Sequence, residues 1–436
     1  MRILSLLPLL LSAPARGDDT ATQLPATLSL QQAIEIFHVH GLDLLIAEAA
    51  VQSAEGGVTA ANAIPNPSLS VSYGAYSFFY SCTNPAGCAR PPSSLDVGLT
   101  DQAAIEDTLS GKRRLRVDVA SAALRAAKLG RADAERTLAF QIKAQFEQVL
   151  LAQRALRFAK DTADANAIML DKAEQQRAAD KIQRPDLLRV KVAKLESDQA
   201  VDQTEQGLRK ARAQLGFLLG VRTSVPEFAV AQPELEHYAL PRPLAAATRE
   251  GLLAQAFASR PDLQAQQAQL AGAEAGLVLA RRQRFPDVTL SLGYTQQGTN
   301  DLASSPPTFS IGLSAPLPVL YQQQGEIRKA AADVRTQRLQ VEKLRATVVN
   351  DFEAAYADFL ASQALVRRME DGGLLDSARQ ARDDIKLLYE TGSAQLVDYL
   401  VALATYIATN VEYLGDVASY WTAVFELEQA VGRDLR

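Results

Sequence analysis

Four short segments of the chain alternate between apolar residues and small or polar residues. They cover about residues 68–77, 93–101, 287–295 and 307–315. In the first, Leu69, Val71 and Tyr73 alternate with serines. This period of two predicts strands with one apolar and one polar face. An ordinary half-buried sheet gives the same pattern, but segments of about ten residues also suit tilted transmembrane strands.

Elsewhere, apolar residues recur at steps of three and four, as Leu138, Ile142, Phe146 and Val149 do. This spacing predicts long amphipathic helices. The predicted helices cover about residues 29–64, 111–178, 186–219, 246–283, 325–390 and 397–431. The second of these would rise roughly 100 Å, which is too long for an ordinary globular domain. We expect coiled-coil-like packing of long antiparallel hairpins.

The two halves of the chain repeat one another. Asp43-Leu44 and Asp262-Leu263 begin similar stretches with an offset of 219, and the offset drifts only to 212 at Asp186 and Asp398. Matches in the same order with small drifts indicate a duplication rather than a chance likeness between alanine-rich helices.

The duplication predicts three parts of the mature chain. They are a first repeat over 16–221, a linker over 222–245 and a second repeat over 246–436. The linker is rich in proline, and we expect it to pack outside the helices.

The N-terminus has the features of a secretory signal peptide over residues 1–15. Arg2 precedes an apolar run, and Ala13-Pro14-Ala15 supplies a cleavage pattern, with Gly17 as the alternative end. Because no cysteine precedes Cys82, we do not expect lipidation of an N-terminal cysteine. The rest of the sequence has no uninterrupted apolar stretch of about 20 residues, the length that a transmembrane helix needs. Insertion of the mature chain into a membrane would therefore require β-strands.

The candidate chemistry is sparse. In an exported protein, Cys82 and Cys88 predict a disulfide closing a small loop. His38 and His40 would point to different faces of a helix, so we expect no metal site there. The net charge of −5 gives no reason to expect a nucleic-acid partner. We find no catalytic constellation and predict neither enzymatic activity nor a cofactor.

Several short motifs carry a family resemblance. They are Ala54-Glu55 leading to Pro65-Asn66-Pro67-Ser68-Leu69, its copy Ala273-Glu274 leading to Phe285-Pro286-Asp287, and Tyr389-Glu390-Thr391-Gly392. In this order they resemble the TolC-like outer-membrane efflux protein family over nearly the whole mature chain. The segment Arg184-Pro185-Asp186-Leu187-Leu188 also looks like heavy-metal, RND-type members.

The resemblance implies a mixed α and β membrane protein. It would be a homotrimer with a twelve-stranded β-barrel, four strands per subunit, continued by a long α-helical coiled-coil tunnel in the periplasm. The partners implied are a periplasmic adaptor (membrane fusion) protein and an inner-membrane RND or ABC pump, so the outer-membrane duct would be passive. Two alternatives stay open: the duct of a type I protein secretion system, and a periplasmic coiled-coil adaptor or structural protein.

The resemblance also implies a gate at the helical tips. Tyr389 matches a tyrosine that bonds an aspartate, here Asp186. Ala394 stands where a basic partner is usual, and Arg184 is a candidate substitute. Asp398 matches one of two constriction aspartates, whereas Val401 replaces the other.

Two features of these tips leave alternatives open. Three copies of Asp398 would favour cations, but helix N-capping would equally explain Asp186 and Asp398. Asp180 stands in the first tip where Gly392 stands in the second, so the first turn is expected to differ.

Overall fold

The computed structural model describes residues 24–74, 93–298, 306–391 and 393–435. The chain divides into two compact units. The first consists of residues 1–42, 141–239 and 364–422, and the second of residues 43–140, 240–363 and 423–436. Each unit therefore combines segments of both predicted repeats. The predicted signal peptide and both cysteines lie outside the described residues.

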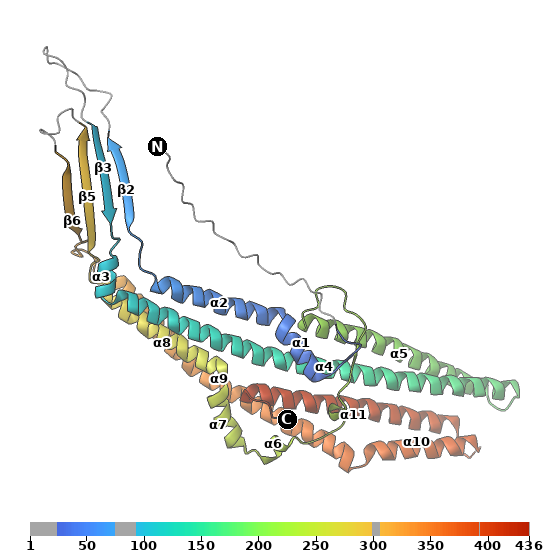
Figure 1. The fold of residues 1–436 in the computed structure, drawn as a ribbon. Coiled ribbons are helices and arrows are strands. Elements are labelled where there is room, and N and C mark those ends of the chain that lie inside the picture. Colours follow the sequence, from blue (N-terminus) through green and yellow to red (C-terminus); the bar gives the residue numbers. More distant parts are fainter. Residues whose placement is uncertain (1–23, 75–92, 299–305, 392, 436) are drawn as a thin grey trace. The chain divides into compact units, whose positions relative to one another are not determined.

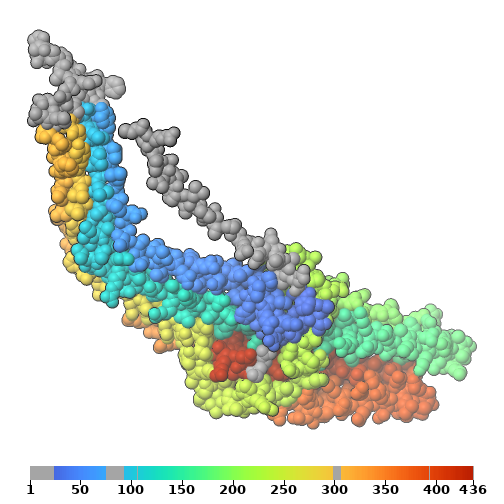
Figure 2. Space-filling model, in the orientation of Figure 1, coloured from blue at the N-terminus to red at the C-terminus, as the bar shows by residue number. Residues whose placement is uncertain are grey.

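The second unit contains a four-stranded antiparallel sheet to which each repeat contributes two strands (Figure 1). The strands are β2 (Ser68–Gly74), β3 (Ser93–Thr100), β5 (Thr289–Gly298) and β6 (Thr308–Ser314), in the order β2-β3-β5-β6. Figure 2 shows the strands of the first repeat beside those of the second. These ranges lie close to the segments in which residues alternate.

The register of the sheet joins the apolar residues of all four strands into one face. Leu99 lies opposite Leu69 and Leu292, and Leu292 lies opposite Ile311. Residues directly opposite one another project from the same face. The large side chains on this face are well exposed in the single chain, with Leu69 at 68% and Ile311 at 77%.

The opposite face of the sheet is small and polar. The hydroxyl of Ser70 donates to the carbonyl of Gly98 over 3.3 Å, and that of Thr295 donates to Asp96 over 2.7 Å. A Cβ on Gly98 would lie 2.6 Å from the Ser70 oxygen, so glycine makes room for this contact. The sheet is therefore amphipathic across its whole width.

The outer strands of this sheet, β2 and β6, each pair on one side only within the described part of the chain. An open strand edge leaves backbone donors and acceptors without partners. The sheet therefore needs either neighbouring strands or a cover at both edges.

The first turn of helix α4 (Lys112–Ala178) fastens the strands to the helices. The ammonium of Lys112 donates to the carbonyl of Phe285 (2.7 Å) and to Asp287 (2.6 Å), just before β5. Arg113 donates to the backbone and side-chain oxygens of Asn62, where α2 (Leu42–Asn62) ends before β2. Cations are unfavourable at a helix N-terminus, and these tertiary bonds offset that cost.

The helices of the second unit lie before and after these strands along the chain. They are α2, α3 (Ala104–Leu109), the first part of α4, α6 (Arg242–Ala246), α7 (Arg249–Ser259), α8 (Pro261–Arg282), the first part of α9 (Gln324–Asp371) and the end of α11 (Leu396–Val431). The helix expected over 246–283 is thus two helices that meet at Arg260. The buried guanidinium of Arg260 lies 2.6 Å from Asp262 and 3.0 Å from Asp351, which fixes the bend.

The first unit contains α1 (Leu30–His40), the rest of α4, α5 (Arg184–Leu218), α10 (Leu374–Glu390) and most of α11 (Leu396–Val431). The helix expected over 29–64 breaks at Gly41, whose N–H caps α1 by donating to the Phe37 carbonyl. The tract expected over 325–390 breaks between α9 and α10, where Gly373 has a φ of +59°. Glycine tolerates this left-handed backbone at no steric cost.

Residues 222–239 of the predicted linker belong to the first unit, where they contact α11 and β1 (Thr27–Leu28). A short strand β4 (Ala229–Val230) pairs in parallel with β1. The hydroxyl of Tyr420 donates to the Ala239 carbonyl over 3.0 Å, and the indole of Trp421 donates to the His237 carbonyl over 3.1 Å. Both rings are buried, so they hold the linker instead of forming a ligand site.

Among the described helices, none is both long enough and apolar enough to cross a membrane.

One charged group in the core of the first unit is unusual. Glu147, on α4 between the buried Phe146 and Val149, is fully buried. Neither of its carboxylate oxygens has a partner among the described residues. Burial, together with the smaller effect of the Glu236 charge, raises the pKa of Glu147 to about 8 despite the lowering effect of Arg154. The side chain is therefore largely protonated at neutral pH.

This pKa predicts a pH-dependent stability. Because an unfolded glutamate ionises near pH 4.5, the folded state holds an extra proton between that pH and about 8. Stability therefore falls by about 1.4 kcal/mol per pH unit across this window and levels off above it. Glu147→Gln should lose this part of the pH dependence in thermal unfolding followed by circular dichroism. Glu174→Gln, at an exposed site on the same helix, is the control; a Glu147→Gln profile parallel to it contradicts the prediction.

Candidate functional site

The candidate site lies at the tips of the two helical hairpins of the first unit. The first hairpin is α4–α5 and the second is α10–α11. These tips carry the residues that the sequence singles out in the two repeats: Asp186 in the first, and Tyr389 and Asp398 in the second.

The first tip turns through Asp180, which has a left-handed φ of +54°. The N–H of Lys181 donates to the Gln176 carbonyl over 2.8 Å, as in a Schellman C-cap. Arg177 holds the turn by donating to the Asp180 carboxylate (3.3 Å) and to the Ile182 carbonyl (3.1 Å). Aspartate tolerates this backbone better than most residues. The equivalent Gly392 lies outside the described residues.

The second tip is capped by Asp398. Its carboxylate accepts the backbone N–H of Gln395 over 3.1 Å, at the start of α11. This is the role that a carboxylate in the first turn of a helix commonly plays. The capping function expected as an alternative for Asp398 is therefore present. Capping uses one carboxylate oxygen and leaves the charge in place.

The two tips share an apolar cluster. Ala173 and Val190 of the first hairpin pack with Leu396 of the second, and Tyr389 lies against them. The Tyr389 ring also stacks on Tyr399, with ring centroids 6.0 Å apart and planes 5° apart. This stack lies within the second hairpin, so the contact between the two tips is mainly the apolar cluster.

The polar bonds between the tips are weak. The Tyr389 hydroxyl lies 3.5 Å from the side-chain oxygen of Gln176, which is a long hydrogen bond. Lys172 lies 3.3 Å from Glu390 in an exposed ion pair. Pairs of this kind contribute little stability.

The resemblance implies a hydrogen bond between Tyr389 and Asp186, but the structure of this chain does not contain it. Burial, and then the charge of Asp186, raise the pKa of Tyr389. The carboxylate of Asp186 instead accepts from Arg189, three residues along α5, over 3.2 Å. Arg184 is exposed, and among the described residues it has no hydrogen-bond partner.

Sequence reasoning therefore missed Arg189 as the basic partner of Asp186. The signal was present, because residues three apart on a helix are neighbours. Gln176 and Tyr399 were also missed, since only the folded tips bring them beside Tyr389.

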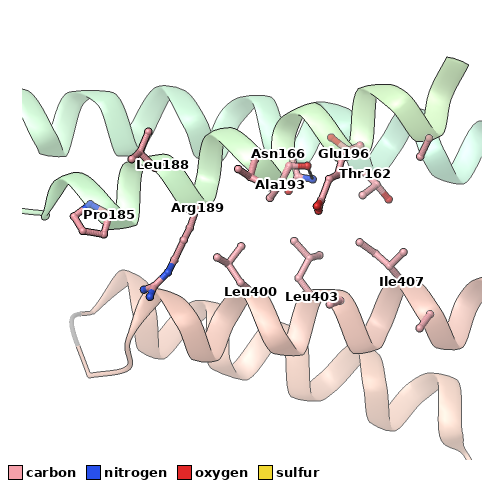
Figure 3. Close-up of a pocket in the computed structure, with 15 residues that line it drawn as sticks. Thr162, Asn166, Pro185, Leu188, Arg189, Ala193, Glu196, Leu400, Leu403 and Ile407 are labelled. Carbon is pink, nitrogen blue, oxygen red and sulfur yellow. Dashed lines mark hydrogen bonds between the residues drawn. The ribbon is translucent and has the colours of Figure 1, made fainter.

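An apolar groove lies beside the tips, between α5 and α11 over α4 (Figure 3). Its volume is about 810 Å³. Leu188 on α5 and Leu400, Leu403 and Ile407 on α11 line its walls. Arg189 extends from α5 toward the turn between α10 and α11 at one end of the groove (Figure 3).

A smaller hollow lies between α10 and α11. Its volume is about 330 Å³, and Asp398, Val401 and Thr405 contribute to its wall together with Ala378 and Ile385. Val401 is 61% exposed, at the position where the resemblance leads one to expect a second aspartate. Asp398 is therefore the acidic group on this surface.

Comparison with known proteins agrees with this architecture. The family described as "Outer membrane efflux protein" matches residues 18–221 and 252–433. The cobalt-zinc-cadmium resistance protein CzcC of Cupriavidus metallidurans is 25% identical over 429 residues, covering 97% of this chain and 96% of that protein. The pyoverdine export outer membrane protein OpmQ of Pseudomonas aeruginosa is 24% identical over 377 residues, covering 84% of this chain and 77% of that protein.

Among solved structures, CusC resembles this chain with a TM-score of 0.75 at 17% identity, covering 93% of this chain and 92% of that one. This likeness concerns the fold. It confirms the predicted fold class, in which a sheet with four strands in each chain is continued by long helices. The two family matches cover most of both halves of the chain. The chain belongs to the outer membrane efflux protein family, and it is an outer-membrane channel of the tripartite efflux type, reaching into the periplasm.

Proposed function

We propose that this channel is the passive outer-membrane duct through which divalent heavy-metal cations leave the periplasm. The observation that carries this proposal is the likeness to CzcC over nearly the full length of both chains. The acidic group at the tip, Asp398, fits cationic cargo. The likeness to OpmQ favours a second candidate, export of small organic molecules.

The proposed duct works as a homotrimer and carries out no catalysis. Energy comes from an inner-membrane pump of the RND type, joined to the duct by a periplasmic adaptor. The apolar groove between α5 and α11 supports this assignment, since it offers a partner helix a wall of Leu188, Leu403 and Ile407 next to the tips. Apolar side chains at regular helical spacing fit such a groove well.

The proposed gate is the contact between the two tips. Separating α5 from α10 exposes the cluster around Tyr389 and takes the charge of Asp186 away from Tyr389. The closed contact relies on the small apolar cluster around Tyr389, one long hydrogen bond and one exposed ion pair, so a small free energy separates closed from open. An adaptor bound beside the tips could supply that energy by binding the separated arrangement more tightly.

The substrate prediction concerns resistance in cells. Deleting the gene should lower the inhibitory concentrations of cobalt, zinc and cadmium salts several-fold while leaving those of dyes and antibiotics unchanged. Complementation with the intact gene should restore metal resistance. Loss of resistance to dyes and antibiotics alone would favour the second candidate, and unchanged resistance in every condition would contradict efflux.

The gate prediction concerns the double variant Tyr389→Phe and Asp186→Ala. It removes the long bond to Gln176 and the partner of Arg189. A net loss of about 1 kcal/mol would shift the closed-to-open equilibrium about fivefold toward open. Single-channel recording in planar bilayers should therefore show a higher open probability. Asp171→Asn, an exposed change on the same hairpin, is the control, and double-variant traces that match it would count against this gate.

The selectivity prediction concerns Asp398→Asn. Asparagine retains an oxygen that can accept the Gln395 N–H, so the cap survives while the charge is lost. Three carboxylates around a pore favour cations. The cation-to-anion permeability ratio, measured from the reversal potential in a salt gradient, should therefore fall. An unchanged ratio in a correctly folded trimer would exclude Asp398 from the conduction path.

A further inference from the structure

The junction between the sheet and the helices of the second unit carries exposed apolar side chains that the channel function does not explain. On the short helix α3, Ile105 is 53% exposed and Leu109 is 82% exposed. In the segment between β6 and α9, Leu317 is 80% exposed and Leu320 is 97% exposed. Side chains this apolar rarely remain in contact with water as a group.

These residues follow the strands directly. Residue 104, where α3 begins, comes four residues after β3 ends at Thr100, and Leu317 comes three residues after β6 ends at Ser314. Both strands end on the side of the sheet where the helices begin (Figure 1). Strand β6 has seven residues and is therefore about 23 Å long. Tilted in a barrel, such a strand spans less than the apolar band of about 25 Å, and the junction continues the apolar surface beyond it.

Basic side chains surround the same junction. Arg114 on α4, Arg282 and Arg284 at the end of α8, and Arg328 and Lys329 on α9 are all exposed. Arg284 has only a weak contact, 3.4 Å from the side-chain oxygen of Gln322.

Three acidic groups near the junction are already engaged. Asp287 binds Lys112, and Asp107 binds Arg116 through two bonds of 2.6 Å. Glu326 accepts the Tyr321 hydroxyl, also over 2.6 Å. These bonds go to partners other than the exposed arginines of the junction, whose charges face solvent.

We propose that this junction is a lipid anchor at the periplasmic surface of the outer membrane. The apolar side chains of α3 and of 316–320 insert among the acyl chains, and the exposed arginines bind phospholipid phosphate groups. Apolar groups beside cations are typical of surfaces that lie in a membrane interface, and guanidinium matches the geometry of phosphate. The proposal rests on the outer-membrane location and not on the substrate.

Fluorescence quenching by brominated phospholipids tests the insertion. The variant Leu320→Trp adds a second tryptophan to the buried Trp421, and the unsubstituted channel gives the background signal. We expect bilayers of brominated phosphatidylcholine to quench the added fluorescence strongly. Leu195→Trp, at a 66% exposed site on α5, is the matched control and should respond only to aqueous acrylamide.

The same experiment separates the alternatives. If the tryptophan introduced by Leu320→Trp responds to neither quencher, it is buried between copies of the chain; if it responds only to acrylamide, it faces water. Either result overturns the anchor. Single-channel recording on the same preparation shows separately whether the channel has assembled.

Mixed bilayers test the role of charge. With bromine only on phosphatidylglycerol, quenching of the introduced tryptophan should exceed that with bromine only on phosphatidylcholine at the same mole fraction. The triple variant Arg114→Gln, Arg282→Gln and Arg284→Gln should abolish this preference. Equal quenching by both lipids in the Leu320→Trp channel with its arginines intact would contradict a role of these arginines in attracting anionic phospholipid.

Discussion

The four-stranded sheet imposes the constraint on which the rest of the structure depends. Its register gathers the apolar residues of both repeats on one face, and its outer strands β2 and β6 each have an unpaired edge within the described chain. A single chain in water would leave both the face and the edges exposed. Hydrocarbon outside and further copies at the edges satisfy both requirements together. The need for a hydrocarbon surrounding and the need for neighbouring strands thus arise from the same sheet.

The helices extend this arrangement into the periplasm. The first turn of α4 binds the chain just before β2 through Arg113 and just before β5 through Lys112. One helix therefore fixes the entry of both strand pairs. At the tips of the hairpins the two repeats differ, because Asp186 is paired with Arg189 whereas Asp398 caps its own helix. The duplication provides similar strands and helices, and the two copies differ in the break at Gly373 and in how their tip aspartates are bound.

Much of the fold was predictable from local patterns. Alternation located the strands, and apolar residues at steps of three and four located α4, because both patterns reflect burial on one face of an element. The interruptions at Gly41, Arg260 and Gly373 were missed. At Arg260 the bend depends on a distant partner, Asp351, which no local pattern contains. The tip residues were identified by resemblance, but their partners depend on rotamers and on packing between hairpins.

Cross-linking in membranes tests whether neighbouring copies close the sheet at its two edges. Cysteines would replace serines on β2 (Ser68, Ser70, Ser72) and on β6 (Ser310, Ser314) in pairs, in a background with Cys82→Ser and Cys88→Ser. If β6 of one copy lies beside β2 of the next, at least one pair should give covalent trimers on oxidation in membranes, and each single cysteine should not. If every pair yields only monomers, although the channel is folded and inserted, the edges do not meet and the account is contradicted.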